Sequence, residues 1–336
     1  MSEKFLPIGS ALEGQVKWKK NKAPKIKLKD KLNRVVNNAP EVVVKVTGGA
    51  KGAAHIKSHM DYLTRNGKIE AENERGMALK TREELRQEHK EWVADLGKTR
   101  KNSRDTINIV LSMPANSDEQ TLKEAVRRFA KEQFAENHRY LMVLHTDKNH
   151  PHVHLTVKAL GEDDRKLDPK KEDLQLWRES FAAKLQELGV EAEATPRFAR
   201  GVVKKSVSMP VVQADKERRS VVQKSKMEQA VRAVVTGNIE RKENPYADKI
   251  KERLTNVELK YKQTADLLRQ SASPRDQELA QKIEGFLKKR FVGHKTEWDE
   301  MITQVKVKQR EVLDKQREIQ KQQEEKTKTK DLDKDR

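Results

Sequence analysis

Four of the nine histidines of this 336-residue chain lie within ten positions, at His145, His150, His152 and His154. Imidazole is costly to bury without a partner, so packing does not explain such a density. It is, however, the commonest protein ligand for divalent metal ions. His152 and His154 are separated by one residue, so on a β-strand both side chains point to the same face. The stretch therefore predicts a metal site.

Two strands are expected to carry these histidines. Residues 139–146 and 151–159 are rich in apolar residues, and the short polar turn 147–150 separates them, which is typical of an antiparallel hairpin. With the turn centred on its middle two residues, His145 lies opposite His152, with their Cβ atoms ~5 Å apart. The two strands thus bring histidines that are distant in sequence to one face of a sheet.

His145, His152 and His154 then converge as three ligands and leave coordination positions open, as catalytic metal sites do. Asp147 is expected to accept a hydrogen bond that orients His145 or His152. His150 sits in the turn and is assigned at most an accessory role. The competing interpretation is a stack of polar cross-strand pairs that holds no metal.

The composition indicates a polyanionic partner. The formal net charge is +19, charged residues make up 37% of the chain and aromatic residues 4%. Excess positive charge of this size favours nucleic acid first and an anionic membrane surface second. The absence of cysteine excludes disulfides, cysteine-based zinc modules and thiol catalysis. No signal core or membrane span is found, so a cytosolic protein is expected.

A phosphate substrate favours Mg²⁺ or Mn²⁺ as a Lewis acid at the three histidines. With no cysteine and no Gly-x-Ser-x-Gly elbow, water and Tyr62 remain as nucleophiles. Tyr62 falls in a helix predicted over 54–65, where Ile56, Met60 and Leu63 form an apolar stripe. Tyr62 is turned about 100° from this stripe, at the edge of the core. Its residue type and position alone favour an ordinary tyrosine with its hydroxyl in water.

Alternating strands and helices predict an α+β fold with helices packed on a central antiparallel sheet. Besides the hairpin, strands are expected at 41–47 and 106–113, and helices at 81–96, 118–137 and 174–188. The expected organisation is a basic flexible arm (1–40), an α+β domain (41–201), a linker (202–214), a basic helical region (215–319) and a polar, disordered tail (320–336). The prediction of a flexible arm is based on its composition, with nine Lys/Arg and one acidic residue between Lys17 and Arg34.

The segment from His145 to His154 resembles the third motif, HxD…PHxH, of conjugative relaxases of the MOBP class, within the HUH endonucleases. Residues 61–68, which follow Thr-Gly-Gly at 47–49, resemble the first motif, which carries a nucleophilic tyrosine. Residues 110–115 resemble the second motif. Matches at 189–201 are similar to the end of the nuclease domain in the relaxase of T-DNA transfer. The resemblance spans about residues 41–201 in the expected order.

The resemblance implies an HUH relaxase fold and a transesterification at a plasmid transfer origin (oriT). Tyr62 would attack one phosphodiester of single-stranded DNA, forming a 5′-phosphotyrosyl bond and releasing a 3′-hydroxyl. A phenol is protonated near neutral pH, so a base or a cation must assist. His150, His59 and Asp61 are the candidates. Lys158 stands where several relatives carry Asn, on the same strand face as the histidines, and would contact phosphate instead.

The implied partners are oriT DNA, relaxosome accessory proteins and a type IV secretion coupling protein, with no insertion into membranes. The expected location is the bacterial cytoplasm, with export alongside the DNA into the recipient cell. A fused helicase is not expected because the chain lacks a GxxxxGK[ST] motif. The alternatives are a rolling-circle replication initiator, a non-catalytic basic DNA-binding protein with a structural histidine cluster, and a metallonuclease that uses water.

Overall fold

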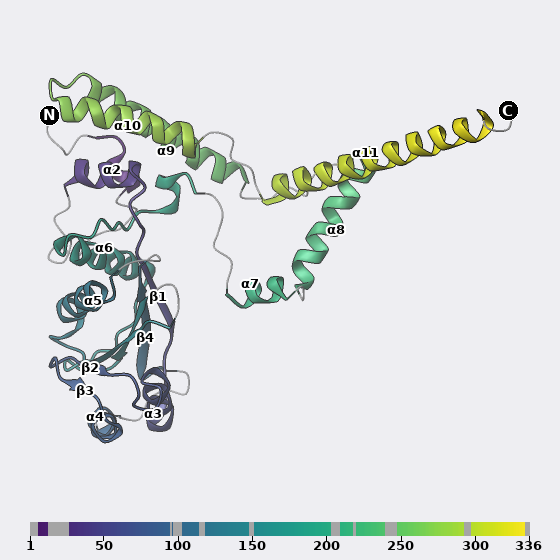
Figure 1. Ribbon diagram of the computed structural model, residues 1–336. Helices are drawn as coiled ribbons and strands as arrows, with labels where there is room; N and C mark the ends of the chain where they lie inside the picture. The colour runs from purple at the N-terminus through teal and green to yellow at the C-terminus, as the bar shows by residue number, and fades with distance from the viewer. Residues whose placement is uncertain are drawn as a thin grey trace. The chain divides into compact units, whose positions relative to one another are not determined.

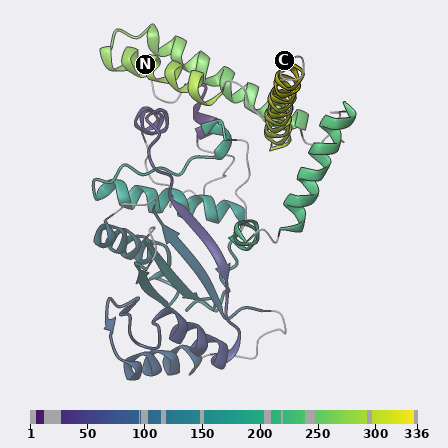
Figure 2. The same cartoon turned by 45° about the vertical axis from the view of Figure 1, so that its right-hand side comes forward.

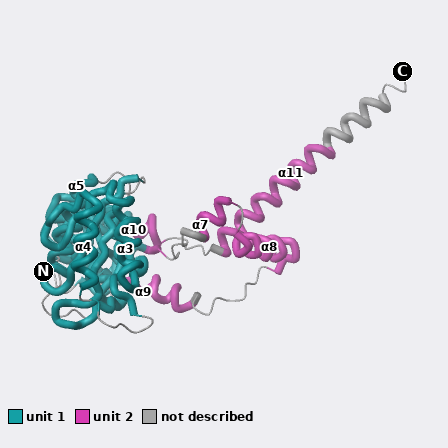
Figure 3. Tube along the Cα trace, turned by 90° about the horizontal axis from the view of Figure 1, so that it is seen from below, with its two compact units in different colours: residues 1–200, 260–286 teal, residues 201–259, 287–336 magenta. Residues whose placement is uncertain are grey.

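The structure is a computed structural model of the chain. It describes residues 6–12, 27–94, 96, 103–113, 118–147, 151–202, 209–217, 220–238, 247–291 and 297–332. Contacts divide the chain into two compact units (Figure 3): residues 1–200 with 260–286, and residues 201–259 with 287–336.

A six-stranded sheet forms the centre of the first unit, and all its pairs are antiparallel. Its order is β1-β4-β6-β5-β2-β3. The strands are β1 (Val43–Gly48), β2 (Ala71–Asn73), β3 (Ala78–Leu79), β4 (Thr106–Ser112), β5 (Tyr140–His145) and β6 (His152–Lys158). Together with the helices around it, this sheet confirms the expected α+β class.

Helices α5 (Glu119–Phe134) and α6 (Lys171–Glu187) cover one face of the sheet (Figure 1). Alternate residues of the strands point into this layer, so Val153, Leu155 and Val157 of β6 are all fully buried. The two helices pack against each other through edge-to-face aromatic contacts, such as that of Phe134 with Trp177, whose ring centroids are 5.3 Å apart. This layer is the larger apolar core of the unit.

Helices α3 (Gly52–Leu63) and α4 (Arg82–Ala94) lie against the other face, where Trp92 of α4 is fully buried (Figure 2). They pack on Leu141 and Val143 of β5 and on the short hairpin β2–β3. The hairpin was not expected from the sequence, because Glu72 and Asn73 break its apolar pattern. Both are buried and paired, Glu72 with Arg127 and Asn73 with Glu88.

The N-terminal segment differs from a flexible arm wherever the structure describes it. Residues 6–12 contain α1 (Gly9–Leu12), residues 27–40 contain α2 (Leu28–Val36), and the remaining arm residues lie outside the described part. The amphipathic spacing of α2 buries Leu32, Val35 and Val36 despite the surrounding lysines. The backbone N–H of Ile8 donates to Thr264 Oγ1 at 3.2 Å. Residues 260–286 thus supply part of the surface on which the N-terminal segment packs.

The C-terminal region is helical where the structure describes it, and its residues 260–286 belong to the first unit. The C-terminal helices are α7 (Met209–Lys216), α8 (Val221–Thr236), α9 (Ala247–Arg269), α10 (Pro274–Arg290) and α11 (Glu297–Leu332). Ala230 of α8 packs with Met301, Ile302 and Val305 of α11. Because α11 continues to Leu332, residues 320–332 are helical where a disordered tail was expected. Among the described residues, no helix has the length and apolar character needed to cross a bilayer.

Candidate active site

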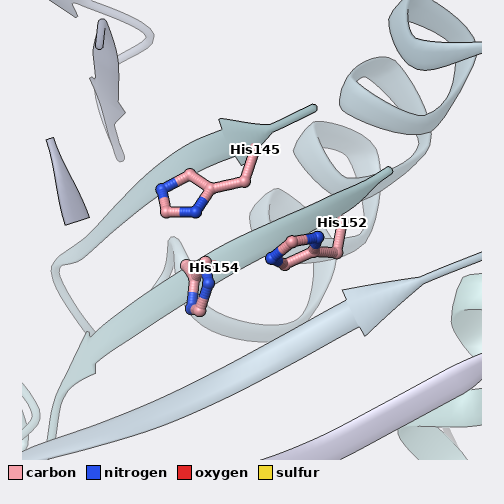
Figure 4. A group of neighbouring side chains, drawn as sticks. All are labelled: His145, His152 and His154. Atoms are coloured by element: carbon pink, nitrogen blue, oxygen red, sulfur yellow. The ribbon is translucent and has the colours of Figure 1, made fainter. Parts of the chain in front are cut away.

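The β5–β6 hairpin brings three histidines to one face of the sheet (Figure 4). His145 pairs directly with His152, so the register expected from the sequence is confirmed. His154 follows on the same face, and the ring centroids of His145 and His154 are 4.6 Å apart. Ligand nitrogens of all three side chains lie within 4.8 Å of one another. Two ligands of one ion stand ~3–4 Å apart, so small ring rotations suffice to hold a metal.

The end of α3 lies against this cluster. His145, which is 7% exposed, contacts the carbonyl oxygen of Leu63 through Nε2 at 2.8 Å. A carbonyl oxygen accepts only, so Nε2 carries the proton and donates. In the neutral ring, Nδ1 then keeps its lone pair for a metal, which is the usual arrangement of a metal-binding histidine.

Two further contacts hold α3 on the sheet. At its start, a Cβ on Gly49 would lie 2.1 Å from the carbonyl oxygen of Thr106, so only glycine allows the chain to pass this close to β4. Midway, His59 Nε2 is 3.1 Å from Thr156 Oγ1 of β6. Burial is the larger cause that lowers the pKa of His59, and the nearby His55 adds to it. His59 is therefore neutral near pH 7.

Tyr62 lies on the outer side of α3, one residue before the carbonyl that binds His145. Its side chain is 70% exposed, whereas Ile56, Met60 and Leu63 are buried, as their helical spacing predicted. The helix thus presents a phenol to solvent at the end that contacts the histidines. This juxtaposition of Tyr62 and the cluster could not be obtained from the spacing alone.

Asp147 is joined to the loop after α3 rather than to a histidine ring in the contacts observed. Its Oδ2 lies 2.7 Å from Arg65 Nη2. Desolvation is the largest single effect and acts to raise the pKa of Asp147, but the hydrogen bond and charge of Arg65, a backbone hydrogen bond and the charge of His145 together lower the pKa. Arg65 and Asn66 both have left-handed backbones, with φ of 49° and 59°, so the chain turns sharply here.

The remaining candidates differ in their surroundings. His150 lies outside the described residues. Asp61 forms an ion pair with Lys57 at 3.2 Å, along the exposed surface of α3. Lys158 is 6% exposed and sits opposite Thr106 at the far end of β6 from His152. That burial does not fit the expectation that Lys158 contacts phosphate.

Comparison with known proteins shows which family the central part of the chain resembles. The family model for the MobA/VirD2-like relaxase nuclease domain matches residues 62–190. Residues 62–190 thus form a domain that resembles relaxase nuclease domains. This domain is similar to the T-DNA border endonuclease VirD2 of Rhizobium radiobacter, with 26% identity over 56% of this chain and 48% of the relative. The VirD2 of Agrobacterium fabrum is 24% identical over 50% of this chain and 42% of the relative. The chain thus spans about half the length of the curated relatives it matches.

Sequence reasoning on the relaxase motifs missed the partners that join them. Arg65 lies three residues after Tyr62, inside the segment that resembles the first motif, and pairs with Asp147 of the third. Their sequence separation hides this contact. The only available signal was a basic residue in one motif and an acidic residue in another, which is too common to predict a pair.

Proposed function

We propose that this relaxase nicks and rejoins single-stranded DNA at a plasmid transfer origin, through a covalent bond to Tyr62. The observation that carries this proposal is the hydrogen bond between His145 and the carbonyl oxygen of Leu63. It brings the end of α3, which carries the exposed Tyr62, against His145, and this supports the pairing of a nucleophile with a metal site that phosphoryl transfer requires.

His145, His152 and His154 are the residues that would hold a divalent ion, Mg²⁺ or Mn²⁺. The donor set fits such an ion, because three imidazoles converge from two paired strands and His145 is fixed by its second nitrogen. When bound, the ion would polarise a non-bridging oxygen of the scissile phosphate and align it for attack. Within the described part of the chain, these three histidines are the one group of side chains found close enough together to hold a metal ion.

The residues of the chain supply the nucleophile and the proton acceptor. The Tyr62 phenol oxygen bonds to phosphorus, the bond from phosphorus to the 3′-oxygen breaks, and a proton moves from the phenol to a base and onto the released 3′-hydroxyl. Of the described candidates, His59 is neutral and three residues before Tyr62 on the same helix, so it can accept that proton. Asp61 is engaged by Lys57. The exchange conserves one phosphodiester, so the reverse reaction rejoins DNA without ATP.

The C-terminal helices would serve the partners of transfer. α8 to α11 are rich in Lys, Arg, Glu and Gln. We assign them to DNA grip, to relaxosome accessory proteins or to the coupling protein of a type IV secretion system, with export alongside the DNA. These assignments rest on the family resemblance and on charge.

The test uses labelled single-stranded DNA that carries the transfer origin, with Mn²⁺, and detects a covalent protein–DNA species on a denaturing gel. Wild type should form the adduct and Tyr62→Phe should not. Tyr140→Phe is the matched control, because burial raises the pKa of Tyr140 to about 12 and keeps it from acting as a nucleophile. An adduct in Tyr62→Phe, or cleavage by wild type to a free 5′-phosphate without adduct, would refute the proposal.

A further inference from the structure

The helices cover only half of the sheet face that carries the histidines. The buried cluster of this layer joins α3 and α4 to residues of β2, β3 and β5, and it includes no described residue of β1, β4 or β6. On the opposite face, the cluster runs from Val44 of β1 to Met142 of β5. Thr106 and Thr156, farther along β4 and β6, are buried on this face, whereas Val110 and Ser112 are half-buried and Lys45 is exposed. The face is therefore open in the rows of His152 and His154, across β4 to the edge strand β1.

The strand register places Lys45 at the outer end of this open half. Residues that pair directly in an antiparallel sheet point to the same face. Lys45 pairs with Val110, and Val110 pairs with His154, so the three form one row across the sheet. Lys45 is exposed, while Val110 and His154 are half-buried. Adjacent strands are about 4.8 Å apart, so the backbones at Lys45 and His154 are separated by ~10 Å.

The chemistry of this half-face suits a phosphate backbone rather than bases. β1, β4 and β6 contain no Phe, Tyr or Trp, so they offer no aromatic platform on which bases would stack. They contain two lysines, and of these Lys158 is buried whereas Lys45 is exposed. Ser112, opposite His152, adds a hydroxyl to the next row.

The strand that carries Lys45 is held firmly at its start. The backbone N–H of Val42 donates to the carbonyl oxygen of Glu193 at 2.9 Å. The carboxylate of Glu41 accepts from the backbone N–H of Thr195 at 2.8 Å and pairs with Arg200 at 3.1 Å. A lysine on an anchored strand loses less conformational entropy when it binds a ligand than a lysine on a loop does.

We propose that one arm of the single-stranded DNA leaves the histidines across β4 and β1, and that Lys45 binds a phosphate of this arm. The proposal rests on the proposed function in taking single-stranded DNA as the substrate. Because the backbones at Lys45 and His154 are ~10 Å apart, Lys45 would bind a neighbouring phosphate and not the scissile one. In the opposite direction, toward β5 and β2, α3 and α4 cover the sheet and leave no path for the DNA arm.

The test measures binding of a fluorescent oligothymidine to the full-length protein over a series of salt concentrations, with chelator present. A contact to phosphate is independent of base sequence, so this probe reports binding whether or not the protein nicks any origin. Each phosphate neutralised on a single strand contributes about 0.7 to the slope of log affinity against log salt. Lys45→Thr suits the exposed strand, Lys45→Arg keeps the charge, and Lys131→Ala on α5 removes an exposed lysine from the opposite layer.

Lys45→Thr should reduce the slope by about 0.7 and weaken binding several-fold at low salt, while Lys45→Arg and Lys131→Ala match wild type. An unchanged slope in Lys45→Thr, or an equal fall in Lys131→Ala, would overturn the proposal. Weaker binding without a change of slope would also overturn it, since the loss would then come from altered structure. Failure of the nicking reaction alone would leave the slopes as predicted and would count against the proposed function instead.

Discussion

His145 donates a 2.8 Å hydrogen bond from Nε2 to the carbonyl oxygen of Leu63, the residue that follows Tyr62. The proposed metal site and the proposed nucleophile are therefore linked through one peptide unit. A shift of the end of α3 changes the orientation of His145 and the position of Tyr62 together. Such coupling keeps the two halves of the site in a fixed relation when DNA enters.

Removing one histidine tests the ligand assignment. His152→Ala should weaken Mn²⁺ binding, measured by isothermal titration calorimetry, by at least ~100-fold, because two imidazoles remain to hold the ion. His55→Ala is the control, since His55 is exposed on α3 and outside the cluster. Equal affinities for His152→Ala and wild type would show that the ion binds elsewhere.

The Arg65–Asp147 pair should position the site rather than stabilise the fold. Both side chains are partly exposed, at 47% and 40%, so solvent screens the pair and it adds little to the free energy of unfolding. Arg65→Asp and Asp147→Arg should each slow adduct formation about 10-fold, which corresponds to ~1.4 kcal/mol of barrier, and hardly change the melting temperature. The protein that carries both exchanges should recover most of the rate in single-turnover assays. Arg65→Asp is compatible with the left-handed backbone at this position, which Asp adopts more readily than most residues. If Asp147 instead acts as a base, the exchange will not restore the rate.

Lys31 offers a test of the buried charges beneath α2. Its Nζ lies 3.6 Å from Glu179 and 3.8 Å from Glu193, and all three side chains are about 1–2% exposed. Lys31→Met leaves Glu179 without its cation, while Glu193 keeps its pair with Arg34 at 3.0 Å, and should lower the unfolding free energy by ~3 kcal/mol near neutral pH. Lys29→Met is the matched control on the same helix, because the Lys29–Asp276 pair is more exposed. Its loss should be about 1 kcal/mol or less.

The unfolding free energy of Lys31→Met should also depend on pH differently from that of wild type. Burial raises the pKa of Glu179 above its ordinary value, and the attraction of Lys31 opposes that rise. A raised folded-state pKa contributes stability at low pH that is lost as pH rises through it. Lys31→Met raises the pKa of Glu179 further. The loss of unfolding free energy relative to wild type should therefore become smaller as the pH falls from ~7.5 to ~5, as measured by urea unfolding. A deficit that grows on acidification would contradict the assignment.

Two truncations test where the nuclease unit ends. Residues 260–286 group with residues 1–200, and Tyr261 is fully buried with its hydroxyl donating to Ala199 O at 2.7 Å. A chain ending after residue 210 should lose more than ~3 kcal/mol of stability and much of its nicking activity. A chain ending after residue 291 should keep both, as followed by thermal unfolding and gel assays. Equal stability of the two truncated chains would show that residues 260–286 are dispensable.

The sequence sufficed for features that depend on local periodicity. The hairpin register followed from a short polar turn between two alternating strands, and the buried face of α3 followed from the spacing of Ile56, Met60 and Leu63. The ligand roles of the histidines and the role of Tyr62 remain predictions, because no metal or DNA contact tests them. Their convergence, by contrast, is visible in the fold.

Features that depend on long-range contacts were beyond reach. The Ile8–Thr264 hydrogen bond joins residues separated by 256 positions, so no local pattern marks residues 260–286 as part of the nuclease unit. The charge-rich α2 suggested an arm because composition does not show which lysines are paired, and Lys31 is buried only through distant glutamates. The β2–β3 hairpin was hidden because its buried residues are polar.

The position of β1 at the edge of the sheet has a second consequence. Edge strands expose unpaired backbone groups to which another chain can add, and proteins counter this with charges, bulges and short edges. Here β3, at one edge, has only two residues, while β1, at the other, carries Lys45 and an irregularity between Val46 and Gly48. The lysine proposed to bind DNA would thus also oppose the pairing of this edge with a strand of another chain.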